Sequence, residues 1–277
     1  NSLSLGMIDI ALKKKTGKTS FVGEVSFGPR GAGQSIPDVN GQSFHIQNLY
    51  ATYAASEKLS LTAGYMGTFI GYEVISPLAN FHYSTSYLFT TGPFQNAGIK
   101  ANYTVSSKVG LMVGLFNDQW NTYQATPEFG LNAFGAQLTV TPAEGLTAYF
   151  NLLTGSESGT IVDLTAAYQM SPKFKLGLNA ADYSGPTSGT GYSGVALYPS
   201  VAISDHFGLG LRAESFKSKT TDTSVSAFTL SANLKSGGLT FIPEIRLDSA
   251  SEDSFYASNG NPTKSASQFA VAMVYGF

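Results

Sequence analysis

The sequence contains no cysteine and few charged residues. Only 12% of its 277 residues are Asp, Glu, Lys or Arg, about half the share of ~25% that is usual in water-soluble domains. The absence of cysteine excludes a disulfide scaffold, a thiolate metal site and a catalytic cysteine. The shortage of charge indicates a surface that does not face water throughout. A net charge of -2 also argues against a nucleic-acid-binding protein, which is normally basic.

Long apolar runs are absent as well. A membrane-spanning helix needs ~20 consecutive apolar residues, whereas the longest runs, 109–116 and 269–277, are much shorter and contain glycine. Disorder is excluded because 43% of the residues are apolar and 13% are aromatic. Residues 1–14 lack the basic start and the cleavage site of a signal peptide. We therefore expect either a mature chain or one whose beginning is missing.

Alternation of apolar and polar residues runs through nearly the whole chain. In 239–248, for example, Phe241, Ile245 and Leu247 alternate with Glu244 and Arg246. Side chains of a β-strand point alternately to opposite faces, so each such segment is predicted to be a strand with one apolar and one polar face. Fifteen segments fit this pattern: 3–13, 19–28, 45–55, 59–69, 96–105, 108–117, 131–141, 146–154, 161–170, 173–183, 194–203, 206–216, 224–235, 239–248 and 267–277.

The segments between these strands alternate in length. Short connections fall at 15–18, 56–58, 106–108, 142–145, 171–173, 204–206 and 236–238, and mostly longer ones at 29–44, 70–95, 118–130, 155–160, 184–193, 217–223 and 249–266. Outer-membrane β-barrels are built with this rhythm, and bacterial ones start in the periplasm with an even number of strands. We therefore predict one all-β domain over 1–277, a transmembrane antiparallel up-and-down β-barrel of about 16 strands, with its first strand before Asn1.

Charged residues fall on the polar rows of the predicted strands. A barrel of ~16 strands is too wide to be filled by side chains, so we expect these rows to line a water-filled lumen and the apolar rows to face lipid. The alternative for the fold is an ordinary β-sandwich. The alternative for the charged residues is that they are solvated side chains without ion preference. Pro243, on an apolar row, predicts a bulge or a strand end. The predicted pore-lining residues are Glu24, Lys100, Asp163, Lys175, Arg212, Glu214, Glu244 and Arg246.

Aromatic residues gather near the ends of the predicted strands, as in the interfacial girdles of membrane barrels. The predicted girdle residues are Phe21, Phe27, Tyr65, Phe69, Tyr103, Tyr168, Phe207, Phe269, Tyr275 and Phe277.

The connection 70–95 is the longest and is unusually apolar. Loops of this length in ordered proteins are usually functional. We expect it to fold into the lumen and narrow the channel, with Glu73, His82 and Tyr83 at the constriction. The alternative is that it covers an outer rim or contacts a neighbouring subunit.

Two stretches carry a resemblance to a known family. The last strand, QFAVAMVYGF (268–277), ends in Phe277 two residues after Tyr275 and looks like the signature that the barrel-insertion machinery reads. The stretch 67–103 is similar to the putative β-barrel porin-2 family, outer-membrane proteins common in the Bacteroidota. Thr85 departs from the family pattern, which often has Arg there. The matching residues are Gly71, Glu73, Asn80, Tyr83, Ser84, Ser86, Phe89, Pro93, Phe94 and Gly98.

The sequence gives only weak indications of a catalytic site. It has no HExxH, GxSxG or P-loop motif, and His45 and His206 fall at a strand start and in a short turn. Acidic and amide residues in 248–261 could bind Ca²⁺, although a solvated loop is the simpler interpretation. We expect no enzyme activity, no cofactor and no metal.

The resemblance and the patterning lead to one function and one rival. We expect a porin of the bacterial outer membrane that lets small hydrophilic solutes diffuse passively through the lumen. The rival is a non-conducting barrel that anchors a surface complex, with loop 70–95 as a plug. Expected partners are outer-membrane lipids and lipopolysaccharide, the insertion machinery, and either further copies of the chain or a surface complex.

Overall fold

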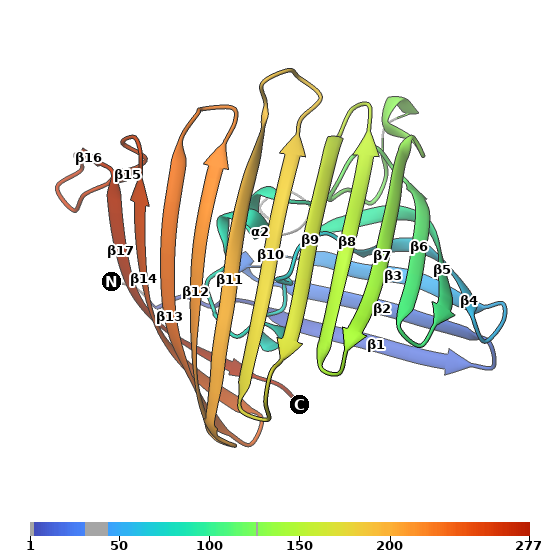
Figure 1. Cartoon of the computed structure of the whole chain (residues 1–277), viewed down its shortest axis with the longest axis horizontal. Coiled ribbons are helices and arrows are strands. Elements are labelled where there is room, and N and C mark those ends of the chain that lie inside the picture. Colours follow the sequence, from blue (N-terminus) through green and yellow to red (C-terminus); the bar gives the residue numbers. More distant parts are fainter. Residues whose placement is uncertain (1–2, 31–43, 126) are drawn as a thin grey trace. The chain divides into compact units, whose positions relative to one another are not determined.

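Antiparallel strands account for most of the chain. The computed structural model describes residues 3–30, 44–125 and 127–277, and Figure 1 shows the strands in chain order. Fifteen of them form one sheet in which each strand pairs with its neighbours in sequence. These strands are β1 (Ile8–Thr16), β2 (Thr19–Phe27), β3 (Phe44–Ala54), β4 (Leu59–Gly67), β5 (Gln95–Ser106), β6 (Val109–Phe116), β7 (Ala133–Ala143), β8 (Leu146–Gly155), β9 (Gly159–Gln169), β10 (Phe174–Ser184), β11 (Gly191–Ser204), β12 (Phe207–Ser218), β13 (Ser224–Ser236), β14 (Leu239–Ala250) and β17 (Ser265–Tyr275).

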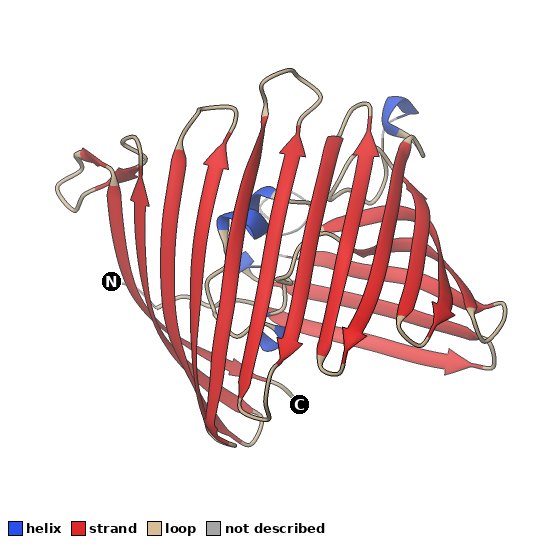
Figure 2. Ribbon diagram, viewed as in Figure 1, coloured by secondary structure: helices blue, strands red, loops and turns tan. Residues whose placement is uncertain are grey.

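Five short elements lie in the connections. They are the 3-10 turns η1 (Pro77–Ala79) and η2 (Pro127–Phe129), the helix α2 (Tyr87–Thr91), and the hairpin of β15 (Phe255–Tyr256) and β16 (Pro262–Thr263). Figure 2 shows how little of the structure is helical. Within the described residues, no helix has the length and apolar character needed to cross a membrane.

The predicted strands are confirmed, with most ends within about three residues. The main difference is the first strand, which runs over 8–16 rather than 3–13. Its pairing with β2 continues to Thr16 and Thr19, because Gly17 takes a positive φ of 58° and so closes a two-residue turn that a residue with a Cβ would strain. The predicted connection 29–44 lies almost wholly outside the described residues. The hairpin of β15 and β16 was not predicted.

The first of two compact units comprises residues Asn1–Ile70, Gly92–Val140 and Phe150–Ile161. Its strand β6 buries one row and exposes the other: Met112 and Phe116 are buried, whereas Leu111, Val113 and Leu115 are about half exposed. Two girdle predictions in this unit are wrong. Tyr65 is buried with its hydroxyl donating to Gln95, and the Phe69 ring packs against the ring of buried Phe116.

The second unit comprises residues Gly71–Thr91, Thr141–Tyr149 and Val162–Phe277. Its strand β13 shows the arrangement clearly: Thr229 and Ser231 are buried, whereas Phe228 and Leu230 are each 52% exposed. A water-soluble sheet has the opposite arrangement, with the apolar face packed and the polar face solvated. The apolar row of this unit therefore suits contact with hydrocarbon.

Pro243 does not cause the predicted bulge or strand end. It lies in the middle of β14, pairs with Val271 on β17, and the register between β13 and β14 is the same on both sides of it, from Ser231–Glu244 to Leu234–Phe241. The missing N–H of Pro243 thus interrupts one ladder locally without adding a residue to the strand. The residues on either side of it keep their pairing.

Candidate functional site

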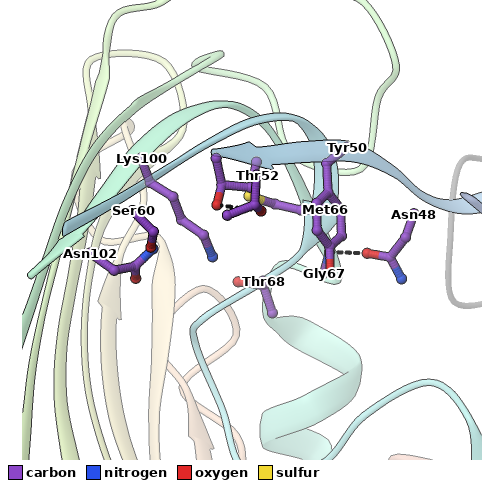
Figure 3. A pocket seen from close by; sticks show the side chains of 10 residues that line it. Asn48, Tyr50, Thr52, Ser60, Met66, Gly67, Thr68, Lys100 and Asn102 are labelled. Carbon is purple, nitrogen blue, oxygen red and sulfur yellow. Dashed lines mark hydrogen bonds between the residues drawn. The ribbon is translucent and has the colours of Figure 1, made fainter. Parts of the chain in front are cut away.

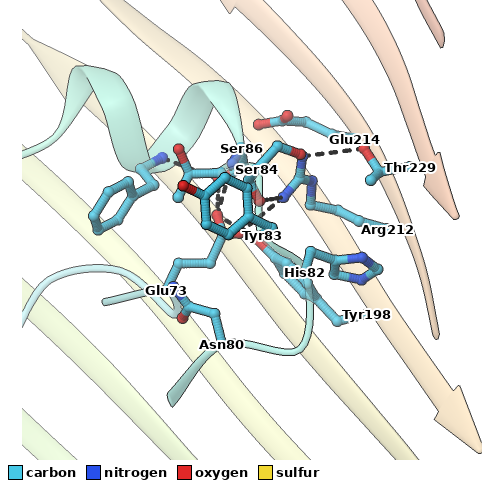
Figure 4. A network of polar contacts seen from close by, with 12 residues as sticks. Glu73, Asn80, His82, Tyr83, Ser84, Ser86, Tyr198, Arg212, Glu214 and Thr229 are labelled. Carbon is cyan, nitrogen blue, oxygen red and sulfur yellow. Dashed lines mark hydrogen bonds and ion pairs between the residues drawn. The ribbon is translucent and has the colours of Figure 1, made fainter. Parts of the chain in front are cut away.

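The connection between β4 and β5 packs on the polar face of the second unit. We call residues 71–91, which include η1 and α2, the long loop. Figure 4 shows that its side chains meet those of Tyr198, Arg212, Glu214 and Thr229 on the strands. The polar row of β11 to β14 is therefore covered by the long loop rather than solvated.

A buried ion pair joins the long loop to β12. Arg212 Nη1 lies 2.9 Å from Glu73 Oε1, and the two side chains are 0% and 4% exposed. Arg212 also donates to the Ser84 carbonyl and to the hydroxyls of Ser84 and Thr229. Glu73 accepts from the backbone N–H and the hydroxyl of Ser86. Both charges are thus compensated inside the protein, which burial of an ion requires.

Strands β11 to β14 form the wall on which the long loop packs. Two further carboxylates of this wall accept hydrogen bonds from the backbone of the long loop. Glu214 accepts from the N–H groups of Tyr87 and Leu88 at 3.0 and 2.9 Å, where α2 begins. Glu244 accepts from the N–H groups of Tyr83 and Ser84 at 3.0 and 3.1 Å. Hydrogen bonds to an ionised acceptor are about twice as strong as neutral ones. The wall carboxylates therefore fix the path of the loop backbone.

Arg246 and Asp248 continue this network along β14. Arg246 Nη1 donates to the Thr85 carbonyl at 2.8 Å, and its guanidinium lies 3.0 Å from Asp248 and 4.9 Å from the centre of the Tyr87 ring. The Tyr87 hydroxyl donates to Asp248 at 3.1 Å. A carbonyl, a carboxylate and an aromatic face thus satisfy one guanidinium.

His82 is the buried histidine of the long loop. It is 2% exposed, and its Nδ1 lies 2.7 Å from the Ser231 hydroxyl. Burial, with a smaller contribution from the Arg212 charge, lowers the pKa of His82 to about 4, against the opposing effect of Glu244. His82 is therefore neutral at pH 7.

Glycines on the polar rows make room for the large apolar side chains of the long loop. A Cβ at Gly210 on β12 would collide with the Phe81 ring, and one at Gly177 on β10 with the Tyr72 ring. Tyr72 also stacks on Tyr198 at a centroid distance of 4.6 Å. These contacts explain why the loop is so apolar in sequence.

Most of the predicted site residues of the second unit belong to this one network. It brings together Glu73, His82, Tyr83, Arg212, Glu214, Glu244 and Arg246. Asp163 on β9 accepts from the Gly71 N–H at 3.1 Å and from Asn179 at 2.5 Å. Lys175, near the turn end of β10, is exposed and stands apart, as do the exposed Tyr275 and Phe277.

Sequence reasoning missed several polar partners of this network. Thr229, Ser231 and Tyr198 were not singled out, although each lies on a strand next to one that carries a predicted charge. Their position on polar rows was a signal that could have found Thr229 and Ser231. Tyr198 could not be found in this way, because its bonding to Glu73 depends on the path of the long loop.

The first unit has a separate polar cavity of about 400 Å³ on β3, β4 and β5. Figure 3 shows its lining, into which Lys100 extends. Glu24 is tied to Asn48 by a hydrogen bond of 2.7 Å, and Asn48 accepts from the Gly67 N–H at 2.8 Å. The lining residues are Asn48, Tyr50, Thr52, Ser60, Thr62, Met66, Gly67, Thr68, Lys100 and Asn102.

Asp118 joins two connections of the first unit. Its carboxylate accepts from the N–H groups of Glu157 and Ser158 at 2.9 Å each and from the hydroxyls of Ser156 and Ser158. Burial alone would raise the pKa of Asp118, but these hydrogen bonds outweigh it and lower the pKa. The carboxylate therefore stays ionised and holds the connection after β6 to the turn between β8 and β9.

Comparison with known proteins places this architecture among porins. An anion-selective porin from Comamonas acidovorans superposes with a TM-score of 0.61 at 12% identity, over 96% of this chain and 83% of that one. OmpT of Vibrio cholerae gives 0.61 at 10% identity, over 96% and 88%. A double mutant of the Rh. blastica porin gives 0.58 at 13% identity, over 97% and 89%. At these identities the likeness concerns the fold alone.

The predicted fold class, an antiparallel up-and-down β-structure of the porin type, is thereby confirmed, and the sixteenth strand stays a prediction. No curated protein matches this sequence. The model of the family described as putative beta-barrel porin-2, OmpL-like, matches residues 1–277. The chain therefore belongs to this family of porins, whose place is the bacterial outer membrane.

Proposed function

We propose that the protein lets small hydrophilic solutes diffuse passively through a water-filled barrel. The observation that carries this proposal is the arrangement of side chains in the second unit, with polar rows on the covered face and large apolar residues such as Phe228 and Leu230 on the exposed one. Lipid-facing and lumen-facing residues alternate in this way in transmembrane barrels. Membership of a porin family supports the same function.

The long loop is proposed to narrow the lumen at a fixed width. Its bonds to Arg212, Glu214 and Glu244 support this role, because a segment held at several points along its backbone does not swing with the solute. Arg212 and Arg246 are neutralised by Glu73 and Asp248, whereas Glu214, Glu244 and Asp163 accept hydrogen bonds from the backbone of the long loop. This leaves Glu24, Lys100 and Lys175 as the predicted charges of the open lumen. Their mixed signs support weak ion selectivity.

The exposed end of the last strand is proposed to serve in assembly. Tyr275 and Phe277 are 64% and 104% exposed. Both side chains are therefore accessible to the barrel-insertion machinery, whose recognition signature the segment 268–277 resembles. Lipid and lipopolysaccharide would cover the apolar rows.

Reconstitution tests the proposed function. Folded protein, identified by its heat-modifiable migration, is added to a planar bilayer, and swelling of liposomes is followed with sugars of increasing size. Stepwise ohmic openings and a size cut-off are the expected results. Correctly folded protein that gives neither would contradict diffusion and favour the rival function, a non-conducting barrel in which the long loop is a plug. A protein that stays monodisperse in buffer without detergent would contradict the membrane-spanning arrangement itself.

A further inference from the structure

The cavity of the first unit contains a cation without a counter-ion. Lys100 lines this cavity from β5 and is only partly exposed. Among the residues that the structure describes, no carboxylate lies within ion-pair distance of its ammonium group. The covered cations of the second unit differ: Arg212 pairs with Glu73 and Arg246 with Asp248.

A partly covered charge is costly unless something compensates it. The carboxylates on the same side of the first unit are Asp9 on β1 and Glu24 on β2, and two strands separate β2 from β5. With a spacing of ~4.8 Å between neighbours, this is roughly 14 Å across the sheet. Glu24 is also held by Asn48. The part of the chain that the structure describes therefore supplies no close negative charge to Lys100.

Hydroxyl and amide groups surround this ammonium group on the polar rows. Lys100 pairs with Thr62 on β4, and Asn102 pairs with Ser60. Thr62 in turn shares a hydrogen bond of 2.9 Å with Thr52 on β3. Within the described ranges, the side chains of Ser60 and Asn102 have no hydrogen-bond partner that would compete with a ligand, and both line the cavity. These groups can donate to and accept from the hydroxyls of a solute, whereas Lys100 can only donate.

We propose that this cavity is a binding subsite for a small hydroxylated carboxylate of the sugar-acid type. The carboxylate lies on Lys100, and the hydroxyls of the ligand bond to Ser60, Thr62 and Asn102. The volume of about 400 Å³ falls within the ~300–1,000 Å³ of small-molecule sites. The subsite rests on the proposed porin function, because the solute would reach it through the lumen.

Ligand binding to the folded protein in detergent micelles tests the subsite without any need for conduction. The probes are gluconate, which has both features, glucose, which lacks the carboxylate, and acetate, which lacks the hydroxyls. Affinities are measured by calorimetry and by saturation-transfer NMR at constant ionic strength. Gluconate is expected to bind more tightly than either of the other two.

Two variants and one matched control locate the site. Lys100→Gln should weaken gluconate binding about tenfold or more, the usual effect of losing one charge-assisted hydrogen bond, and should leave glucose binding unchanged. Thr62→Val should weaken gluconate but not acetate. Lys108→Gln removes an exposed lysine from the turn that follows β5 and should change nothing. Heat-modifiable migration confirms that each variant is folded.

The outcomes separate this inference from the porin function. Equal binding of gluconate and glucose, or wild-type affinity in Lys100→Gln, overturns the subsite even if the protein conducts. Absence of conduction contradicts the proposed diffusion instead, and the binding series then decides the subsite by itself.

Discussion

The guanidinium of Arg212 on β12 and the carboxylate of Glu73 in the long loop lie 2.9 Å apart, and neither side chain is more than 4% exposed. The two residues are separated by 139 positions in the sequence. Removing one partner of such a pair costs about 3–5 kcal/mol, because the other charge stays buried and unpaired. This ion pair is therefore the contact on which the docking of the long loop depends most.

Arg212→Gln is expected to release the long loop from the wall. The loop contains Phe81, Tyr83, Tyr87 and Phe89, which chymotrypsin cleaves once they are accessible. Cleavage of the folded protein in detergent should accelerate at least tenfold, and the single-channel conductance should rise. In the double variant Glu73→Gln with Arg212→Gln, the loss of docking free energy should be smaller than the sum of the losses in the two single variants. Double-mutant cycles show such non-additivity for residues in contact.

An exposed ion pair is the control for this experiment. Lys217 and Asp222 lie 2.7 Å apart with side chains 51% and 84% exposed. Lys217→Gln should leave cleavage and conductance unchanged, since exposed pairs contribute at most about 1 kcal/mol. Equal effects of the two substitutions would show that docking does not depend on the buried pair.

Docking of the long loop should weaken in acid because of His82. The pKa of His82 is about 4 in the docked loop, below the ordinary value of about 6.5, so the released loop binds more protons between these two values. Docking therefore weakens as the pH falls from about 6.5 to about 4, by up to ~1.4 kcal/mol for each pH unit. The measurement is hydrogen–deuterium exchange of the loop amides, pulsed at each pH across this range and corrected for the intrinsic exchange rate at that pH.

The pH series has its own pair of variants. His82→Gln removes the titrating group and should flatten the dependence, whereas His206→Gln, in an exposed turn, should preserve it. A dependence that survives in His82→Gln would assign it to another group, such as Glu244.

Gly210→Ala is expected to displace the long loop through Phe81. The added methyl group would occupy the space of the Phe81 ring, so chymotrypsin cleavage near this residue should increase about tenfold. Gly208→Ala, two residues earlier on the same strand, comes within 3.2 Å of the Val201 carbonyl but meets the same ring only at 3.6 Å, an ordinary contact, and should have a smaller effect on the long loop. Combining Gly210→Ala with Phe81→Ala should restore protection of the rest of the loop, and failure to do so would argue against a steric cause.

Asp118→Ala should loosen the connection between β6 and β7. The substitution leaves two backbone N–H groups and two hydroxyls without their acceptor, at a cost of about 2–3 kcal/mol. The single tryptophan of the chain, Trp120, lies two residues away, so its emission maximum should shift to longer wavelength. Asp205→Asn, in an exposed turn, is the control and should leave the emission unchanged.

The strands could be predicted from the sequence because period-two alternation is local information. The same alternation identified Arg212, Glu214, Glu244 and Arg246 as residues of the polar rows. What these residues contact could not be predicted, because the path of the long loop is set by contacts over more than a hundred positions, such as that of Tyr87 with Glu214.

Residues that depart from the period-two alternation also show the difference between local pattern and distant contacts. Ile242 is an apolar residue on a polar row, and the sequence alone offers no reason for it. In the structure it is 2% exposed and packs with Ala272, Val274 and Tyr83 of the long loop. Tyr65 and Phe69 are aromatic residues near a strand end, as girdle residues are, but the residues they contact, Gln95 and Phe116, come from other strands.

The orientation of Phe228 and Leu230 on β13 has a consequence for biogenesis. In water these side chains have no interior to collapse onto, because the opposite face of their strand is occupied by Thr229 and Ser231. The hydrophobic gain that drives most proteins to fold is released here only when hydrocarbon replaces water around the sheet. Insertion and folding are therefore one event, and until it happens the newly made chain must be shielded from other copies of itself.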